Sequence, residues 1–193
     1  LLLQRRDNSA FLCSMSLFQA TLATGFALMA LGLPLLLVNK LARGLAIRFP
    51  RSKPVATVTM IVGTGWFLMR HVLNLSDADF GDYKGLITII SLAILLFSFL
   101  YLPDFLAVRG TSILVLLFAR EAIDAAFQQE PSSRVFMVGA VYVAIVLALY
   151  LSAWPYRLRD FFDWLFQKDI RVKAIGATMA CYGLFLGSVA YGY

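Results

Sequence analysis

The chain has 193 residues, of which 61% are hydrophobic and 15% are charged. Soluble domains are about 45–50% apolar and about 25% charged, so this composition excludes an ordinary soluble domain. The formal charge of +6 resides in short segments beside apolar runs, which argues against a nucleic-acid partner. Apolar runs of about 20 residues, enough to cross a hydrocarbon core of about 30 Å as helices, recur along the sequence. We therefore expect an all-α polytopic membrane helix bundle and not the short alternating segments of a β-barrel.

The predicted elements begin with a short tail. Residues 1–15 either form this tail on the non-cytoplasmic side or precede a start at Met15. Residues 16–193 are expected to form a single transmembrane domain, with spans at 16–38, 54–75, 86–102, 111–127, 135–154 and 174–193. The basic segment after the first span, KLARGLAIRFPRSKP, is expected to be a loop that contacts anionic lipid headgroups.

The positions of lysine and arginine predict the orientation of these spans. Eleven of them fall in the segments after the first, third and fifth spans, four fall on the other side, and Arg70 and Arg120 fall inside spans. Cytoplasmic loops of membrane proteins carry the excess of basic residues. Both termini are therefore predicted to be non-cytoplasmic.

The segment 155–168, between the fifth and sixth spans, is predicted to be an amphipathic helix. Pro155 suits a first helical turn, and Asp160 and Asp163 lie on the polar face. The apolar face consists of Leu158, Phe161, Phe162 and Leu165. We expect this helix to lie on the cytoplasmic surface of the bilayer, and a docking helix for a partner protein is the alternative.

Charged residues inside the fourth span are the main candidate site. At about 1.5 Å per residue, Arg120 lies about 14 Å into the span, near the bilayer midplane. Arg120 and Asp124 are four residues apart and share a helix face, whereas Glu121 points about 100° away. Arg70 in the second span is placed near the depth of Asp124, and His71 lies beside it. The sequence thus predicts a buried intramembrane cluster of Arg70, Arg120, Glu121 and Asp124.

Three interpretations of this cluster remain open. It holds the helices in register, or it lines a polar path for a proton, an ion or a small anion. The third interpretation is a shifted fourth span, in which Glu121 and Asp124 lie at the outer surface.

His71 is the only histidine in the sequence. We interpret it as a structural hydrogen-bonding residue, with haem or chlorophyll ligation as the alternative, although membrane haems commonly use two histidines. No catalytic motif and no paired metal-ligand spacing occurs, and the short connections leave no room for a soluble catalytic domain. No enzyme activity, metal or cofactor is therefore predicted.

Small residues predict where helices approach closely. Gly176, Gly183 and Gly187 in the sixth span include a GxxxG motif, which is typical of helix packing in membranes. Because this span is almost free of charge, its glycine face suits docking against another chain.

The C-terminal run VYVAIVLALYLSAWPYRLRDFFDWLFQKDIRVKAIGATMACYGLFLG resembles a family of very small, two-span bacterial inner-membrane proteins of uncharacterised function. The shared pattern is an apolar span, a proline followed by basic and aromatic residues, Asp169 and Arg171, and a second span with Gly176 and Gly183. The resemblance covers about the last 50 residues. It implies a bacterial inner-membrane location and an accessory role rather than a reaction.

The function expected from the sequence is a non-catalytic integral subunit, or an assembly or stabilising factor, of a larger membrane complex. Its expected partners are other membrane protein subunits and a bilayer that includes anionic lipids. A small transporter or channel that uses the charge cluster is the alternative, and a pigment- or haem-binding subunit is the third hypothesis. The transporter hypothesis lacks the inverted repeat that many carriers show.

Overall fold

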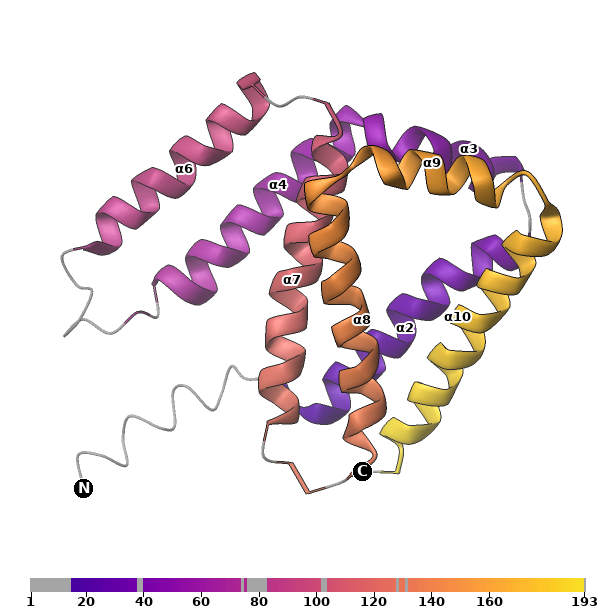
Figure 1. Ribbon diagram of the computed structural model, residues 1–193. Coiled ribbons are helices and arrows are strands. Elements are labelled where there is room, and N and C mark those ends of the chain that lie inside the picture. The colour runs from indigo at the N-terminus through magenta and orange to yellow at the C-terminus, as the bar shows by residue number, and fades with distance from the viewer. Residues whose placement is uncertain are drawn as a thin grey trace. The chain divides into compact units, whose positions relative to one another are not determined.

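The computed structural model describes residues 15–37, 40–73, 75, 83–101, 104–127, 129–130 and 132–192. Within these ranges the chain is helical and contains no β-strand, which confirms the all-α prediction (Figure 1). The predicted N-terminal tail lies outside the described residues apart from Met15. The elements in chain order are α2 (Leu17–Leu36), α3 (Lys40–Arg48), η1 (Phe49–Arg51), α4 (Lys53–Phe67), η2 (Leu68–Val72), α6 (Lys84–Tyr101), α7 (Leu106–Ala126), α8 (Arg134–Ala153), α9 (Tyr156–Leu165) and α10 (Asp169–Ala190).

Five helical segments among the described residues are long and apolar enough to cross a membrane. They are α2, α4 continued by η2, α6, α8 and α10. The helix of the fourth predicted span, α7, has 21 residues but is not among them, because it carries Arg109, Arg120, Glu121 and Asp124. The structure thus supports five candidate spans, and a sixth span through α7 stays a prediction.

The structure differs from the sequence-based expectation in the basic segment after the first span. Residues Lys40–Arg48 form the helix α3, followed by the short 3-10 helix η1, where a loop is expected. Two further helices extend beyond their predicted spans: α7 begins at Leu106 and α10 at Asp169. A span prediction stops where polar residues begin, whereas the helix continues through them, and Asp169 in the first turn of α10 complements the helix dipole.

Side chains satisfy the backbone at the start of α2. The Ser16 hydroxyl accepts a hydrogen bond from the Gln19 backbone N–H at 3.2 Å, and the Gln19 side chain accepts one from the Ser16 N–H at 3.1 Å. This reciprocal capping box fixes where the helix begins. Within the helix, the buried hydroxyl groups of Thr21 and Thr24 donate to carbonyls one turn earlier, both at 2.8 Å. These polar groups therefore need no water.

The chain divides into two compact units. The first combines Leu1–Asn39, Phe118–Ala144 and Asp169–Tyr193, and the second combines Lys40–Leu117 and Ile145–Lys168. Helices α7 and α8 therefore each contribute residues to both units.

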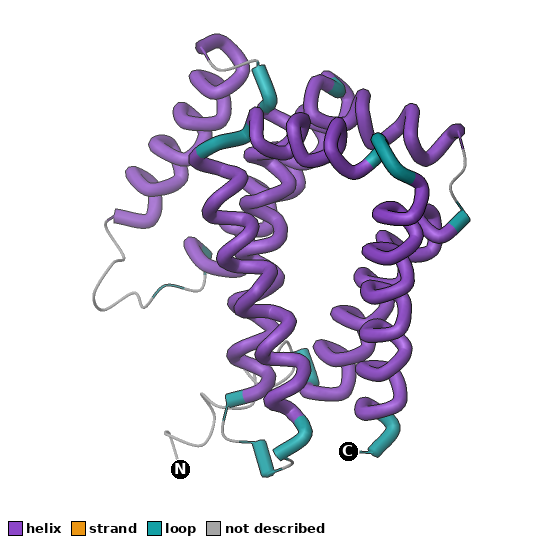
Figure 2. The backbone as a smooth tube through the Cα atoms, turned by 45° about the vertical axis from the view of Figure 1, so that its right-hand side comes forward, coloured by secondary structure: helices purple, strands orange, loops and turns teal. Residues whose placement is uncertain are grey.

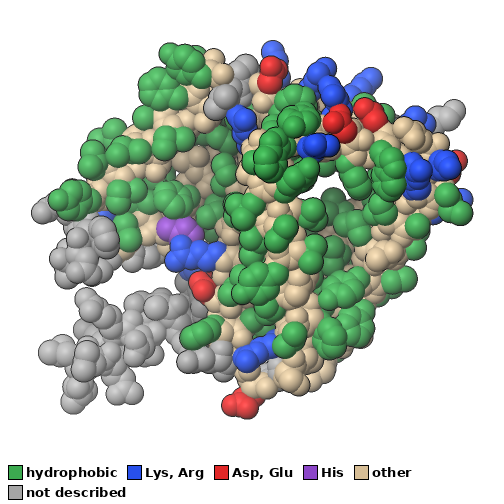
Figure 3. Space-filling view, in the orientation of Figure 1, with side chains coloured by type: hydrophobic (Ala, Val, Ile, Leu, Met, Phe, Trp, Pro, Cys, Tyr) green, Lys and Arg blue, Asp and Glu red, His purple; other side chains and the backbone are tan. Residues whose placement is uncertain are grey.

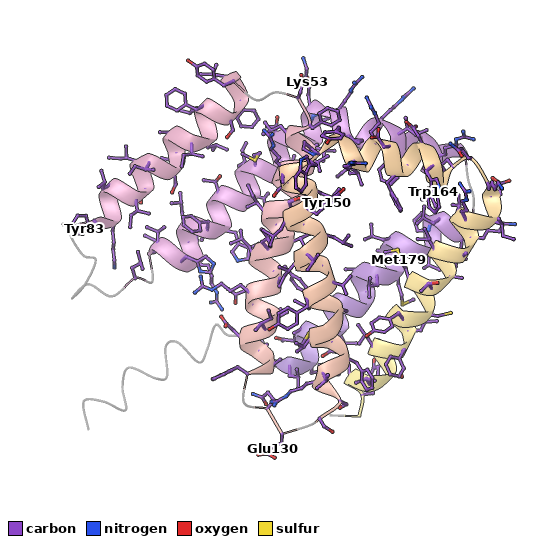
Figure 4. All side chains as sticks on the ribbon, in the orientation of Figure 1. Lys53, Tyr83, Glu130, Tyr150, Trp164 and Met179 are labelled. Atoms are coloured by element: carbon purple, nitrogen blue, oxygen red, sulfur yellow. The ribbon has the colours of Figure 1, made fainter. Side chains whose placement is uncertain are left out.

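The first unit is centred on the pair α2 and α10, which lie side by side in both views (Figure 1 and Figure 2). Gly25 and Gly32 of α2 face Gly183 and Gly176 of α10, so the two helices run antiparallel. A Cβ atom on Gly32 would lie 2.8 Å from both the Ala180 nitrogen and the Gly176 carbonyl oxygen. Met179 of α10 (Figure 4) lies against the same glycine. The backbones are thus as close as glycine permits.

The second unit has its core between α4, α6 and the first half of α7. Ala56 and Met60 of α4 are buried together with Leu106 and Ala107 of α7, and Val55, Leu95 and Phe99 pack against them. A Cβ atom on Gly110 of α7 would collide with the Thr59 side chain of α4. Every residue of α6 is nonetheless at least partly exposed, and α6 is long and apolar enough to cross a membrane.

Candidate functional site

The predicted charge pair on α7 is present in the first unit. Arg120 Nε lies 3.9 Å from Asp124 Oδ2, which is the i, i+4 geometry that the spacing predicts. The two side chains are 61% and 69% exposed, so the burial expected for them from the sequence is not seen. Glu121, one residue further along, is half-buried.

The exposure of Arg120 and Asp124 is explained by the opposite face of this part of α7, which is buried. Ala119, Ala122 and Ala126, spaced as successive turns of one face, are 2%, 0% and 5% exposed. At about 100° per residue, Arg120 and Asp124 lie well away from this alanine face. The small alanine side chains allow this face of α7 to pack closely against other helices of the protein. The ion pair lies on the other side of α7 and is therefore exposed.

Arg70 and His71 lie in the second unit, in the π-helical turn η2 that continues α4. The Leu73 N–H donates to the Leu68 carbonyl at 3.0 Å, five residues back. The His71 ring meets the Phe67 ring edge-to-face, with 5.8 Å between ring centroids. This wider turn ends the helix, with Leu73 as its C-cap residue. The sequence places both residues in the second span but gives no signal of this turn, because an inserted residue leaves the apolar pattern almost unchanged.

Arg70 belongs to the second unit, and Arg120, Glu121 and Asp124 belong to the first. The meeting of all four residues in one cluster therefore stays a prediction.

The C-terminal end of α7 is stabilised by Arg134, a role that is not evident from the sequence. Its guanidinium group donates to the Ala126 carbonyl at 3.1 Å and also to the Gln129 carbonyl. Carbonyls at a helix C-terminus lack intrahelical partners, and a cation there also complements the helix dipole. Arg134 thus fixes the end of the helix that carries the charge pair.

Two of the three predicted packing glycines are used within the chain. Gly176 and Gly183 face α2, and a Cβ atom on Gly183 would lie 2.7 Å from the Gly25 carbonyl oxygen. No atom lies within 4 Å of the Cβ position of Gly187. Sequence reasoning missed the matching glycines, Gly25 and Gly32, although their seven-residue spacing repeats that of Gly176 and Gly183.

A shallow groove continues beyond the last glycine contact. It has a volume of about 400 Å³ and runs between α2 and α10, lined by residues that include Leu22, Phe26, Leu184 and Gly187. Phe18 and Tyr191 meet edge-to-face next to it, with 5.9 Å between ring centroids. The lining is almost entirely apolar, so the groove offers no polar chemistry.

The predicted apolar face of the amphipathic helix is divided in α9. Leu165 is 1% exposed, Leu158 and Phe162 are half-buried, and Phe161 is 42% exposed. The observed helix, Tyr156–Leu165, is shorter than the predicted 155–168. Part of this face is therefore buried, and part of it is open.

No group of three or more His, Cys, Asp or Glu side chains that could hold a metal ion gathers in the described ranges. No known protein family, curated protein or solved structure matches the chain. In the part of the chain that the structure describes, the fold is thus all-α, with five helices suited to spanning a membrane and an exposed ion pair on a further long helix, α7.

Proposed function

We propose that this protein is a non-catalytic integral subunit, or an assembly factor, of a larger membrane protein complex. In this proposal α7 crosses the bilayer as a sixth span, both termini are non-cytoplasmic, and the membrane is a bacterial inner membrane. The resemblance of the C-terminal residues to small two-span inner-membrane proteins implies the same accessory role.

The observation that carries this proposal is the exposure of the Arg120–Asp124 pair. An ionised side chain at the bilayer centre costs about 2.5–3.5 kcal/mol even on insertion scales, so such residues usually face protein or a water-filled cavity. The alanine face of α7 is buried and the ion pair is exposed, and we infer that another chain covers the charged face. A second subunit that covers this face would shield the ion pair from lipid, which would explain how a membrane span can carry these charges.

Photo-crosslinking tests whether a protein covers this face. The crosslinking amino acid replaces Phe127, which follows Asp124 by three residues and Arg120 by seven and is 68% exposed. The matched control replaces Leu96 of α6, which is 64% exposed and lies on a helix suited to face lipid. We expect one protein adduct from position 127, with a protein that also co-purifies stoichiometrically, and none from position 96. No protein adduct at 127, or the same adducts at both positions, would contradict the proposal.

A small transporter or channel is the second candidate. The position of Arg70 and His71 at the end of a helix long and apolar enough to cross a membrane favours it, because ionisable residues within such spans often line ion pathways. In that case replacing Arg120 would abolish flux through reconstituted vesicles while the protein still folds normally.

A further inference from the structure

Helices α3 and α9 of the second unit lie side by side, although more than 100 residues separate them in the sequence (Figure 1). The Arg43 guanidinium group lies over the Phe166 ring, 5.8 Å from its centroid, and links the two helices. The residues 40–53 and 155–168, which contain these helices, are named the α3–α9 layer below. This layer is not evident from the sequence, in which the first of its two segments is expected to be a loop.

The charges of the α3–α9 layer are strongly one-sided. Residues 40–53 contain five basic residues and no acidic one, and residues 155–168 contain three basic residues beside Asp160 and Asp163. Asp160 is held by Arg159 in an ion pair of 3.0 Å. The basic side chains gather over α3 and α9 in the space-filling view (Figure 3), and the exposed ones are Arg43, Arg48, Arg51, Lys53, Arg157, Arg159 and Lys168. The layer thus presents a cationic surface.

Large apolar side chains are exposed among these charges. Leu45 and Ile47 of α3 are 70% and 45% exposed, and Phe161 and Trp164 of α9 are 42% and 46% exposed. Leu165 and Phe166, next to Trp164, are instead buried. The layer therefore combines buried apolar side chains with a second set of exposed ones. Lys53 and Trp164 mark its two segments in Figure 4.

We propose that the α3–α9 layer binds anionic phospholipid headgroups of the cytoplasmic leaflet. Guanidinium and ammonium groups pair with lipid phosphates, while aromatic and aliphatic groups such as Trp164 and Leu45 enter the boundary between headgroups and acyl chains. Charge complementarity selects lipid over a protein partner, because a surface with so few acidic groups matches a uniformly anionic leaflet. This proposal does not depend on the existence of partner subunits.

Lipid-specific quenching of Trp164 fluorescence tests the proposal on the full chain. Trp66→Phe and Trp154→Phe leave Trp164 as the sole tryptophan. The protein is reconstituted into vesicles of equal amounts of phosphatidylcholine and phosphatidylglycerol, with the acyl chains of one lipid brominated at a time. We expect both lipids to quench Trp164, with an association constant for phosphatidylglycerol about threefold or more above that for phosphatidylcholine. High salt should reduce this preference, because it screens exposed charges.

In the variant Arg48→Gln, Arg157→Gln, Lys168→Gln, the ratio of the association constants for phosphatidylglycerol and phosphatidylcholine should fall close to one. This variant removes three exposed charges and no contact that links the two helices. The control Lys84→Gln, on the side predicted to be non-cytoplasmic, should leave this ratio unchanged. Equal quenching by the two lipids in the unmodified layer would overturn the proposal. Absence of quenching by either lipid would overturn it too, because the face would then lie in water or under another protein.

Discussion

Replacing Gly183 by alanine is expected to lower the free energy of unfolding by about 1–3 kcal/mol, the usual range for overpacking a close contact. The added Cβ atom would lie 2.7 Å from the Gly25 carbonyl oxygen and 3.1 Å from the Met29 nitrogen. Both are backbone atoms, so no side-chain rotation can relieve the clash, and α2 and α10 must move apart. Gly32→Ala should have a similar effect at the other end of the contact, where backbone atoms of α10 lie 2.8 Å from its Cβ position.

The matched control is Gly187→Ala, one helical turn further along α10, where no atom lies within 4 Å of the Cβ position. Alanine favours helix over glycine by about 1 kcal/mol, so this change should be neutral or stabilising.

Pyrene labels on cysteines at positions 18 and 191, in a chain without Cys13 and Cys181, report the separation of α2 from α10. The rings of Phe18 and Tyr191 meet in the native structure, so excimer emission should be strong. An SDS titration should abolish excimer emission at a lower SDS fraction in Gly183→Ala than in Gly187→Ala. Equal midpoints for the two variants would show that the glycine contact is not close in the folded protein.

The second large effect concerns the charges on α7. Arg120→Leu and Asp124→Leu should each reduce the yield of folded protein at least several-fold, because in the proposed sixth span each leaves one ionised group without its i, i+4 partner at lipid depth. The double variant Arg120→Leu, Asp124→Leu should recover much of this yield, since it removes both charges. The two single effects should therefore be strongly non-additive, as expected for residues in direct contact.

Yield is measured as monodisperse protein per cell mass after extraction in mild detergent. The exchange Arg120→Asp, Asp124→Arg is the control, because it keeps the pair and reverses its direction. If all four variants gave the yield of the unmodified protein, the pair would lie at the outer surface in water, as a shifted fourth span predicts. An exposed surface pair contributes only about 0–1 kcal/mol.

The helical fold and most helix positions follow from the sequence for a simple reason. A segment that crosses lipid must satisfy its backbone internally and must be apolar along its whole length, so composition alone indicates where it lies. The Arg120–Asp124 spacing is equally direct, because four residues bring two side chains to one face. Helix α9 is predicted from the helical spacing that places its aromatic and charged residues on different faces.

Features that depend on which helices contact each other cannot be predicted from composition and residue spacing. A GxxxG motif in α10 indicates a close approach, but it does not identify α2 as the helix that approaches. The exposure of Asp124 depends on which face of α7 the buried alanines occupy, and alanine carries too little hydrophobic signal to reveal that face. Helix α3 is missed because Arg43 and Arg48 dominate its composition, so that the segment resembles a charged loop.

The most direct test of the proposed subunit role is native mass spectrometry of the unmodified protein and the double variant Arg120→Leu, Asp124→Leu, each extracted gently from its own membrane. The subunit role predicts that the unmodified chain is recovered with at least one different protein in fixed stoichiometry, and that the double variant is recovered folded but without this partner. The same spectra would reveal any bound haem or pigment. Recovery of the unmodified chain as a bare monomer or homodimer would contradict the subunit role.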